Sequence, residues 1–547
     1  MKKIAAIAFG LVFSFLAAGQ GAVNNEVVTD PPKNWFNLDP VADRVNGVST
    51  EKAYELLKDR TSQAVIVAII DSGIDIEHED LKDVIWTNPG EIAGNGIDDD
   101  GNGYIDDIHG WNFLGGKDGR NVNYETLEVT RIYKKLSAKY EGKSQKEVPK
   151  SDRDEYEQWL KIKGEFEEAY VKAKQELDLY EDVNRFIQRY TKLFEAYLDT
   201  DVVTYEKIKN VSSNDAIIEL SQRHMLAIYD ATDENMTLEE LRDAIEADME
   251  SIREPANYSY NLEYDLRAEI VQDDPNKLDE IGYGNNDVIG KDTDNFHGTH
   301  VAGIVAASRG NGLGVDGVAN NVQIMAIRAV PQGDETDKDV ANAIRYAVDN
   351  GARVVNMSFG KGYSPNQGYV SEAIEYAASK GVLLVHAAGN SAQDIDKNDN
   401  FPNDNFGSGK NWSHWIEVGA SSWGEADDYI GSFSNYGKKN VDLFAPGVAI
   451  HSTAPENEYT DAQGTSMASP VVSGVAALLL SYFPELEAEQ VKDILMRSVR
   501  SVKGLKVTKP GEAIKEVDFS KLSVSGGIIN AYEAVKLAMS MEMGTGK

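Results

Sequence analysis

Cysteine is absent from this chain of 547 residues. The fold is therefore held without disulfides, no thiol serves as nucleophile or metal ligand, and a lipid anchor on a cysteine is excluded. Positive charge is also scarce, because 54 Lys and Arg residues stand against 90 Asp and Glu residues and give a formal net charge of −36. Since phosphates would be repelled, nucleic acid is not an expected partner. The simplest explanation of the acidity is a solvated surface.

Long apolar runs are lacking after the N-terminus. There, Lys2 and Lys3 precede an apolar stretch from Ile4 to about Leu16 and the small residues 17–19. This order is typical of a signal peptide, which we place at residues 1–22, and it predicts export to the periplasm or the extracellular medium. The stretch is too short to cross a bilayer. No membrane span is expected in the mature protein.

Short β-branched runs alternate with helical patterns over much of the chain. The runs lie at 64–70, 322–330, 353–357, 382–388, 416–420 and 441–444. Helical patterns lie between several of them, as at 339–348 and 372–378. Alternation of this kind predicts an α/β fold with a doubly wound parallel sheet, whose active site lies beyond the carboxyl ends of the strands.

Three segments supply the groups of a serine nucleophile. Ser466 lies in Gly464-Thr465-Ser466-Met467-Ala468-Ser469-Pro470, at the start of a predicted helix. A serine needs a base and a group that orients the base. His297 opens the segment 297–303, and Asp71 follows the apolar run 64–70 and opens the segment 71–75.

These three segments, in this order, resemble the signatures of the subtilisin-like serine proteases (subtilases, peptidase S8 family). The resemblance implies a subtilisin-like sheet and protein or peptide substrates. It also implies that Ser466 attacks the scissile carbonyl, that His297 acts as general base and then acid, and that Asp71 orients His297. Asn390, in His386-Ala387-Ala388-Gly389-Asn390-Ser391, resembles the family asparagine that donates to the oxyanion; in isolation it would more simply cap a turn.

The same resemblance places substrate binding at the ends of two predicted strands. Ser358, Phe359 and Gly360 match the edge segment that pairs with an extended peptide. Ala387, Ala388 and Gly389 would line the other side of the S1 pocket, and Phe401-Pro402 would form part of its floor. The family also usually carries a folded pro-domain before the aspartate, and residues 23–60 are too short for one.

Residues 95–107 are rich in aspartate, asparagine and glycine. With Asp98 as position 1, Asp100, Asn102 and Asp106 fall at positions 3, 5 and 9 of a calcium loop, and Tyr104 offers a backbone carbonyl. The pattern predicts a structural calcium ion. The alternative is an Asx-rich turn that binds no metal.

The segment 122–280 separates Asp71 from His297 by far more than the family's usual spacing. Aromatic and apolar residues recur there at helical spacing and predict an inserted all-α subdomain with its own core; the residues are Tyr156, Trp159, Leu160, Phe166, Tyr170, Val183, Ile187, Tyr190, Phe194 and Tyr197. We therefore divide the remainder into peptidase parts at 61–121 and 281–540, with a tail at 541–547. The insertion is expected to restrict access of large substrates; an inert decoration or a partner platform is the alternative.

The expected function is an exported, calcium-binding serine endopeptidase. Two alternatives remain open at this stage. One is a binding protein of the same fold that has lost turnover, since fold alone does not give function. The other is a protease dedicated to processing a single partner protein.

Overall fold

The structure is a computed structural model that describes residues 31–232, 235–290, 295–404, 413–424, 428–512 and 514–545. The predicted signal peptide lies outside these residues. The described chain divides into two compact units, one of residues 129–264 and a larger one formed by the residues before and after it. Residues 122–128 and 265–280, which the sequence analysis assigned to the insertion, belong to the larger unit.

The larger unit is built on a nine-stranded sheet in the order β10-β13-β7-β6-β5-β4-β1-β3-β2. All neighbouring strands run parallel except β10 and β13. The strands are β1 (Val65–Asp71), β2 (Gly110–Asn112), β3 (Val322–Arg328), β4 (Val354–Met357), β5 (Leu383–Ala387), β6 (Trp415–Ser421), β7 (Leu443–Pro446), β10 (Arg500–Ser501) and β13 (Gly527–Ile528). The predicted α/β fold with a parallel sheet is confirmed.

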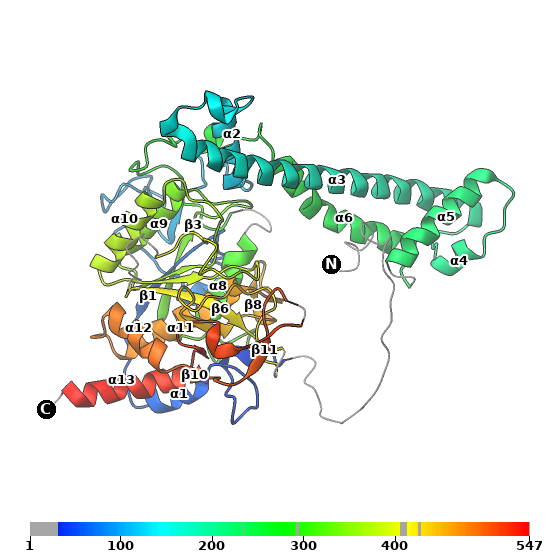
Figure 1. The fold of residues 1–547 in the computed structure, drawn as a ribbon. Coiled ribbons are helices and arrows are strands. Elements are labelled where there is room, and N and C mark those ends of the chain that lie inside the picture. Colours follow the sequence, from blue (N-terminus) through cyan, green and yellow to red (C-terminus); the bar gives the residue numbers. More distant parts are fainter. Residues whose placement is uncertain are drawn as a thin grey trace. The chain divides into compact units, whose positions relative to one another are not determined.

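Alternate residues of β1 face two separate helical layers, as the period of a strand requires. Val67 and Ile69 pack with helices on one face, and Ala68 and Ile70 pack with helices on the other. The first face carries α1 (Thr50–Leu57), α8 (Phe296–Ala306), α11 (Thr465–Tyr482), α12 (Ala488–Arg497) and α13 (Ala531–Thr545), and the second carries α9 (Asp337–Asp349) and α10 (Gln367–Ser379). In Figure 1, α9 and α10 lie above the sheet and α11 to α13 below it.

Smaller elements complete the larger unit. Two antiparallel pairs lie outside the main sheet, β8 (Ile450–Ala454) with β9 (Glu458–Ala462), and β11 (Lys506–Thr508) with β12 (Glu516–Asp518). The short helix α7 spans Arg267–Ile270, and single 3₁₀ turns cover Trp35–Asn37, Lys82–Val84 and Phe519–Lys521.

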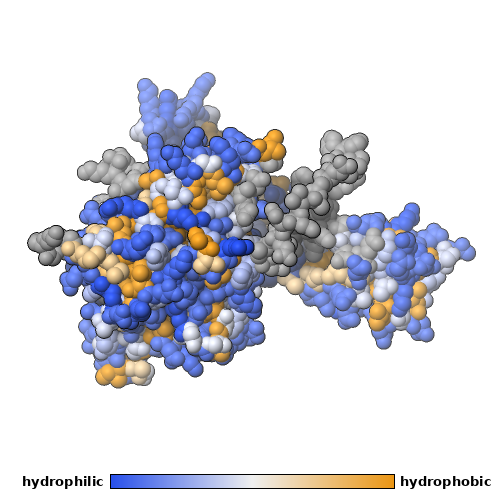
Figure 2. Space-filling model, turned by 90° about the horizontal axis from the view of Figure 1, so that it is seen from below, coloured by the Kyte–Doolittle hydropathy of each residue, from blue (hydrophilic) through white to orange (hydrophobic). Residues whose placement is uncertain are grey.

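Within the described residues, one helix is long and apolar enough by composition to cross a membrane, namely α11. Its apolar window is 89% buried inside the larger unit, so its composition is that of a core helix. On the face shown in Figure 2 the molecular surface is mostly hydrophilic, with hydrophobic side chains scattered among polar ones. This agrees with a chain of net charge −36.

The regular elements described in the smaller unit are helices, as predicted, apart from one isolated β-bridge between Thr204 and Thr237. Its longest element is α3 (Arg153–Leu198), whose 46 residues span about 69 Å at 1.5 Å per residue. The others are α2 (Glu128–Tyr140), α4 (Tyr205–Lys209), α5 (Ala216–Ala231) and α6 (Leu238–Glu254), followed by a π-helical turn at Pro255–Ser259; 3₁₀ turns at Gln145–Glu147 and Lys150–Asp152 precede α3. Figure 1 shows α6 running beside α3.

Two apolar clusters hold this unit together, one between α2 and the start of α3 and one where α4, α5 and α6 pack on the rest of α3. Tyr156, Trp159, Ile187 and Phe194 are buried in them, as predicted. The prediction was wrong for three residues of the aromatic and apolar pattern, because Leu160, Tyr170 and Tyr197 are 51%, 37% and 43% exposed. A long helix paired along one face leaves apolar residues on its other face in solvent.

Candidate active site

Asp71 and His297 lie 226 positions apart in the chain and are hydrogen-bonded. His297 Nδ1 donates to Asp71 Oδ1 at 2.7 Å. The same oxygen accepts from the backbone N–H of Ser72 at 2.8 Å, and the Asp71 side chain is only 1% exposed. A buried carboxylate at the end of β1 thus fixes which imidazole nitrogen carries the proton.

Gly298 explains why the histidine helix reaches the aspartate. A Cβ at this position would lie 2.2 Å from the carbonyl oxygen of Gly73 and 3.1 Å from Asp71 Cβ. Real Cβ atoms essentially never show a contact as short as 2.2 Å, so only glycine lets α8 approach the loop after β1 this closely. His297, the residue before it, is thereby brought against Asp71.

Two opposing effects set the pKa of His297. Burial lowers it, but attraction to the Asp71 charge and the hydrogen bond to Asp71 together raise it above the ordinary value. Imidazolium is therefore stabilised at this position. That is the form a general base takes once it has accepted a proton.

Ser466 is the second residue of α11 and is bound to the segment after β4. Its hydroxyl donates to the carbonyl oxygen of Ser358 at 3.0 Å, and among the described residues it makes no hydrogen bond to His297. In return, the Ser358 hydroxyl donates to the Ser466 carbonyl at 2.9 Å. That carbonyl lacks its helical partner because Pro470, four residues on, has no N–H.

The register of the sheet brings Ser358 beside Asp71. Ile70 of β1 pairs with Met357 of β4, so Asp71 and Ser358 are the next residues along two neighbouring parallel strands. Ser466 is bound to Ser358 and His297 to Asp71. The three predicted catalytic residues therefore gather at the carboxyl ends of adjacent strands.

Asn390 follows β5, the next strand of the sheet, and its amide has a defined orientation. The backbone N–H of Thr465 donates to Asn390 Oδ1 at 2.8 Å, and the Thr465 hydroxyl donates to the same atom at 3.0 Å. Of the two polar atoms of an asparagine amide, only the oxygen can accept a hydrogen bond from an N–H. The amide nitrogen of Asn390 therefore points away from Thr465, and its two protons can be donated to another group. Thr465 itself was missed by the sequence analysis.

The predicted substrate-binding residues follow β4 and β5, which are neighbours in the sheet. After β4, Ser358 is buried, Phe359 half-buried and Gly360 exposed. Ala387 ends β5; Ala388 is buried and Gly389 half-buried beyond it. Gly389 has φ +97°, and a Cβ there would lie 2.5 Å from Asn435 Nδ2. The two segments thus lie at the same edge of the sheet.

Residues 62–512 match the family model described as the subtilase family. The chain belongs to the subtilase family. It is 43% identical over 188 residues to the thermophilic serine proteinase of Bacillus sp. (strain AK1), 41% over 202 residues to subtilisin DY of Bacillus licheniformis, and 42% over 188 residues to thermitase of Thermoactinomyces vulgaris. These alignments cover 34%, 37% and 34% of this chain and 43%, 69% and 62% of the relatives.

Solved structures of similar proteins include a protease from Pseudoalteromonas arctica. The sequence identity is 29%, the TM-score 0.36, and the match covers 44% of this chain and 70% of that one. A cold-adapted subtilisin-like serine proteinase matches with 32% identity and a TM-score of 0.34, over 44% of this chain and 77% of that one.

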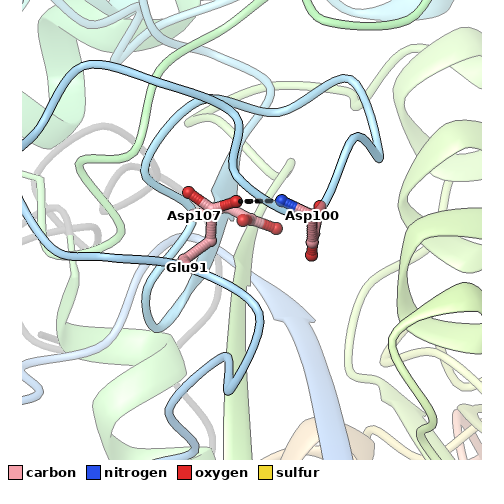
Figure 3. A group of neighbouring side chains, drawn as sticks. All are labelled: Glu91, Asp100 and Asp107. Atoms are coloured by element: carbon pink, nitrogen blue, oxygen red, sulfur yellow. Dashed lines mark hydrogen bonds between the residues drawn. The ribbon is translucent and has the colours of Figure 1, made fainter.

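This subtilase also contains a group of three carboxylates in the loop between β1 and β2. Glu91, Asp100 and Asp107 each place a carboxylate oxygen within 4.8 Å of the other two. Figure 3 shows the three side chains turned toward one another; the dashed line is the bond from the Asp100 N–H to Glu91 Oε1. Asp107 is fully buried, and burial raises its pKa to about 6 although Tyr346, Asn102 and Asn88 donate to it.

Of the three predicted aspartate ligands, the structure brings only Asp100 into this group of carboxylates, and the amide of the predicted ligand Asn102 lies beside it. The carboxylate of Asp98 accepts backbone N–H groups of residues 101–103, and that of Asp106 accepts those of residues 95 and 96. Asn102 donates from its amide to Asp100 and Asp107 at 3.1 Å each. Glu91 was missed because it precedes the motif, and Asp107 because it stands one residue past the matched position.

The chemistry of this donor set fits a hard divalent cation. Carboxylate oxygens from three residues converge here. The amides of Asn88 and Asn102 each donate to both Asp100 and Asp107, and each amide also carries an oxygen that could bind a cation. A bound cation would relieve the repulsion between the carboxylates and the cost of burying Asp107.

Proposed function

We propose that this subtilase is a serine endopeptidase that hydrolyses peptide bonds in protein or peptide substrates through Asp71, His297, Ser466 and Asn390. The observation that carries the proposal is the 2.7 Å hydrogen bond between a buried Asp71 and His297, next to the strand ends that hold Ser466 and Asn390. The names of the relatives, a serine proteinase, a subtilisin and thermitase, support it.

In the first step the Ser466 hydroxyl leaves the Ser358 carbonyl, passes its proton to His297 Nε2 and attacks the scissile carbonyl carbon. Hydrogen bonds of this kind often form only once substrate is bound. The resulting oxyanion accepts from the Asn390 amide and from the Ser466 N–H, which has no acceptor within its helix because it lies in the first turn. Asp71 stabilises the imidazolium meanwhile.

His297 then donates its proton to the leaving amine, and the C–N bond breaks to leave an acyl group on Ser466. Water repeats the sequence: His297 takes its proton, the hydroxide adds to the acyl carbon, and the proton returns to Ser466 as the acid leaves. Ser358–Gly360 and Ala387–Gly389 are the segments that would hold the substrate on its two sides.

Kinetics of Ser466→Ala and of the double variant with His297→Ala test this proposal. Ser466→Ala is expected to lose peptide hydrolysis while keeping its circular dichroism spectrum and melting temperature. Adding His297→Ala is expected to cost little more, since deletions within one cooperating set are far from additive. Undiminished hydrolysis by pure, folded Ser466→Ala would refute the assignment.

We also propose that the protein is exported and that the loop containing Glu91, Asp100 and Asp107 binds a structural calcium ion. Export is supported by the basic, apolar and small residues of 1–22. Mass spectrometry of the protein recovered from cell fractions reports the mature N-terminus; a chain that keeps residue 1 in the cytoplasmic fraction contradicts export.

A further inference from the structure

Lys361 directly follows the predicted substrate-binding segment, and its side chain is almost fully buried. Its exposed fraction is 2%. The ammonium lies 2.9 Å from Glu128 Oε2 and 2.8 Å from Asp337 Oδ1, and it donates to the carbonyl oxygen of Glu335 at 2.7 Å. An ammonium buried in this way is tolerable only because acceptors of opposite charge surround it.

The backbone of Lys361 is fixed as well. Its N–H donates to the carbonyl oxygen of Phe401, and the Phe401 N–H donates back to the Lys361 carbonyl, each at 2.9 Å. At the other end of the segment, Ser358 exchanges hydrogen bonds with Ser466. Phe359 and Gly360 therefore lie between two points that are both held, one of them at the nucleophile.

The two residues whose carboxylates bind Lys361 each begin a helix and are fixed by further hydrogen bonds. Glu128 is the first residue of α2, and its N–H donates to Asp334 at 2.8 Å. Asp337 is the first residue of α9, and it also accepts from the Ser364 hydroxyl at 2.8 Å and the Asn366 N–H at 2.7 Å. The side chains of Glu128 and Asp337 are 8% and 3% exposed, so Lys361 is bound to two buried carboxylates.

We propose that Lys361 is a positioning residue that keeps Ser358–Gly360 in the extended form needed to pair with the substrate backbone. This rests on the proposed function. Lys361 touches no substrate; it acts by holding the end of the segment between Phe401 and the carboxylates of Glu128 and Asp337. Its loss is expected to weaken binding of substrates that extend along the segment and to spare those that reach only the scissile bond.

The test compares a tetrapeptide amide with a single-residue ester for the wild type, Lys361→Met and Lys361→Arg. For Lys361→Met the KM of the tetrapeptide amide is expected to rise about tenfold, on the scale of one lost hydrogen bond. Its kcat, and both constants for the ester, are expected to stay within about twofold. Lys361→Arg keeps the charge and is expected to recover most of the KM.

Lys492→Met is the matched control. Lys492 is also a largely buried lysine, bound to Asp442 and to the carbonyl of Trp415, but Trp415 begins β6 and so lies at the end of the sheet away from the active site. Its removal is expected to lower the melting temperature without changing the KM of the tetrapeptide amide. Equal loss on both substrates in Lys361→Met, or no change on either, overturns the inference.

Two measurements keep the result decisive. If Lys361→Met does not fold, Glu128→Gln, which removes one carboxylate and keeps the ammonium paired with Asp337, is expected to raise the KM of the tetrapeptide amide in the same selective way; an unchanged KM overturns the inference. If the wild type hydrolyses neither substrate, the proposed function fails. In that case the role of Lys361 is tested by calorimetric measurement of tetrapeptide amide binding. Binding by Lys361→Met is expected to be weaker than binding by the wild type, and equal binding overturns the inference.

Discussion

The Thr465 hydroxyl and N–H together determine the orientation of the Asn390 amide. Both donate to Asn390 Oδ1, and the hydroxyl also accepts from the Gly389 N–H at 3.0 Å. In the proposed mechanism the amide protons are thus already oriented for the oxyanion before substrate binds. Preorganised donors of this kind lower the barrier without reorganising during the reaction.

Removing the Asn390 amide is expected to reduce kcat more than removing the Thr465 hydroxyl. Asn390→Ala is expected to lower kcat roughly 10²–10³-fold, as for other oxyanion donors. Thr465→Val keeps the N–H but loses both hydrogen bonds of the hydroxyl, to Asn390 and from Gly389, so a loss of about threefold to tenfold is expected, and Thr465→Ser is expected to restore it. KM is expected to change little, because the oxyanion exists only in the transition state. Steady-state kinetics with one peptide substrate measure all three, and a larger loss in Thr465→Val than in Asn390→Ala contradicts this order.

The raised pKa of His297 leads to a prediction for the pH dependence of activity. In the proposed mechanism His297 is the general base and must be neutral, so activity is expected to fall as the pH drops through its pKa. We expect the midpoint of kcat/KM against pH to lie above 6.5, the ordinary value for imidazole. In Asp71→Asn the charge that raises the pKa is gone while the effect of burial, which lowers it, remains. NMR titration of the His297 ring, which needs no turnover, is expected to show a lower midpoint in this variant, and an unchanged or higher midpoint contradicts the account.

At the scale of single elements, the loop with Glu91, Asp100 and Asp107 is expected to depend on calcium for its stability. A ligand that binds only the folded state adds about 2.7 kcal/mol at a hundredfold excess over Kd. Chelation is therefore expected to lower the melting temperature, and added calcium to restore it. Asp100→Asn and Asp107→Asn are expected to lose most of that response.

Asp493→Asn is the control for this measurement, since Asp493 is an exposed acid on α12 that pairs with Arg497 on the same helix. It is expected to respond to calcium like the parent. If Asp100→Asn and Asp107→Asn do so too, the group is not the site.

The strands and the catalytic motifs could be predicted from the sequence because each depends on a short, continuous stretch of residues. β1, β3, β4 and β5 each begin and end within two residues of the predicted apolar runs, since a buried parallel strand needs a short, continuous β-branched stretch. The partners of Lys361 were not accessible. Glu128 lies 233 positions away, and nothing in the residues around either one indicates that the fold brings them together.

The same limit applies to Glu91 and to the long helix α3. Glu91 has no periodic relation to the aspartates that follow it, so only the folded loop places it beside Asp100. In α3, helical spacing indicates which residues share a face of the helix. It does not indicate how many faces of the helix are covered by other helices. Leu160 and Tyr197 were therefore assigned to a core from which they are excluded.

At the scale of the whole molecule, the helical unit is an insertion whose two ends meet. The Thr130 hydroxyl donates to the carbonyl of Ser259 at 2.8 Å, so the chain enters and leaves the unit at neighbouring points. A short Gly-Ser linker in place of residues 129–264 is therefore expected to leave the larger unit folded, because closing a short loop costs little.

The linker variant also tests the predicted restriction on substrate size. The chain between Asp71 and His297 carries the helical unit, and those two residues are in contact. If the unit restricts access, its removal is expected to raise casein cleavage relative to cleavage of a tetrapeptide amide. An unchanged ratio in a folded, active variant shows that the unit is a decoration or a platform for a partner.

The most direct test of the central claim is covalent labelling of the serine. A phosphonofluoridate reacts with a serine only when its base and oxyanion donors are in place. Peptide mapping by mass spectrometry is expected to find one label, on Ser466, that is lost in Ser466→Ala and formed far more slowly in His297→Ala. A folded wild-type protein that takes up no label, or takes it up on another residue at the same rate in both variants, would contradict a working Asp71–His297–Ser466 triad.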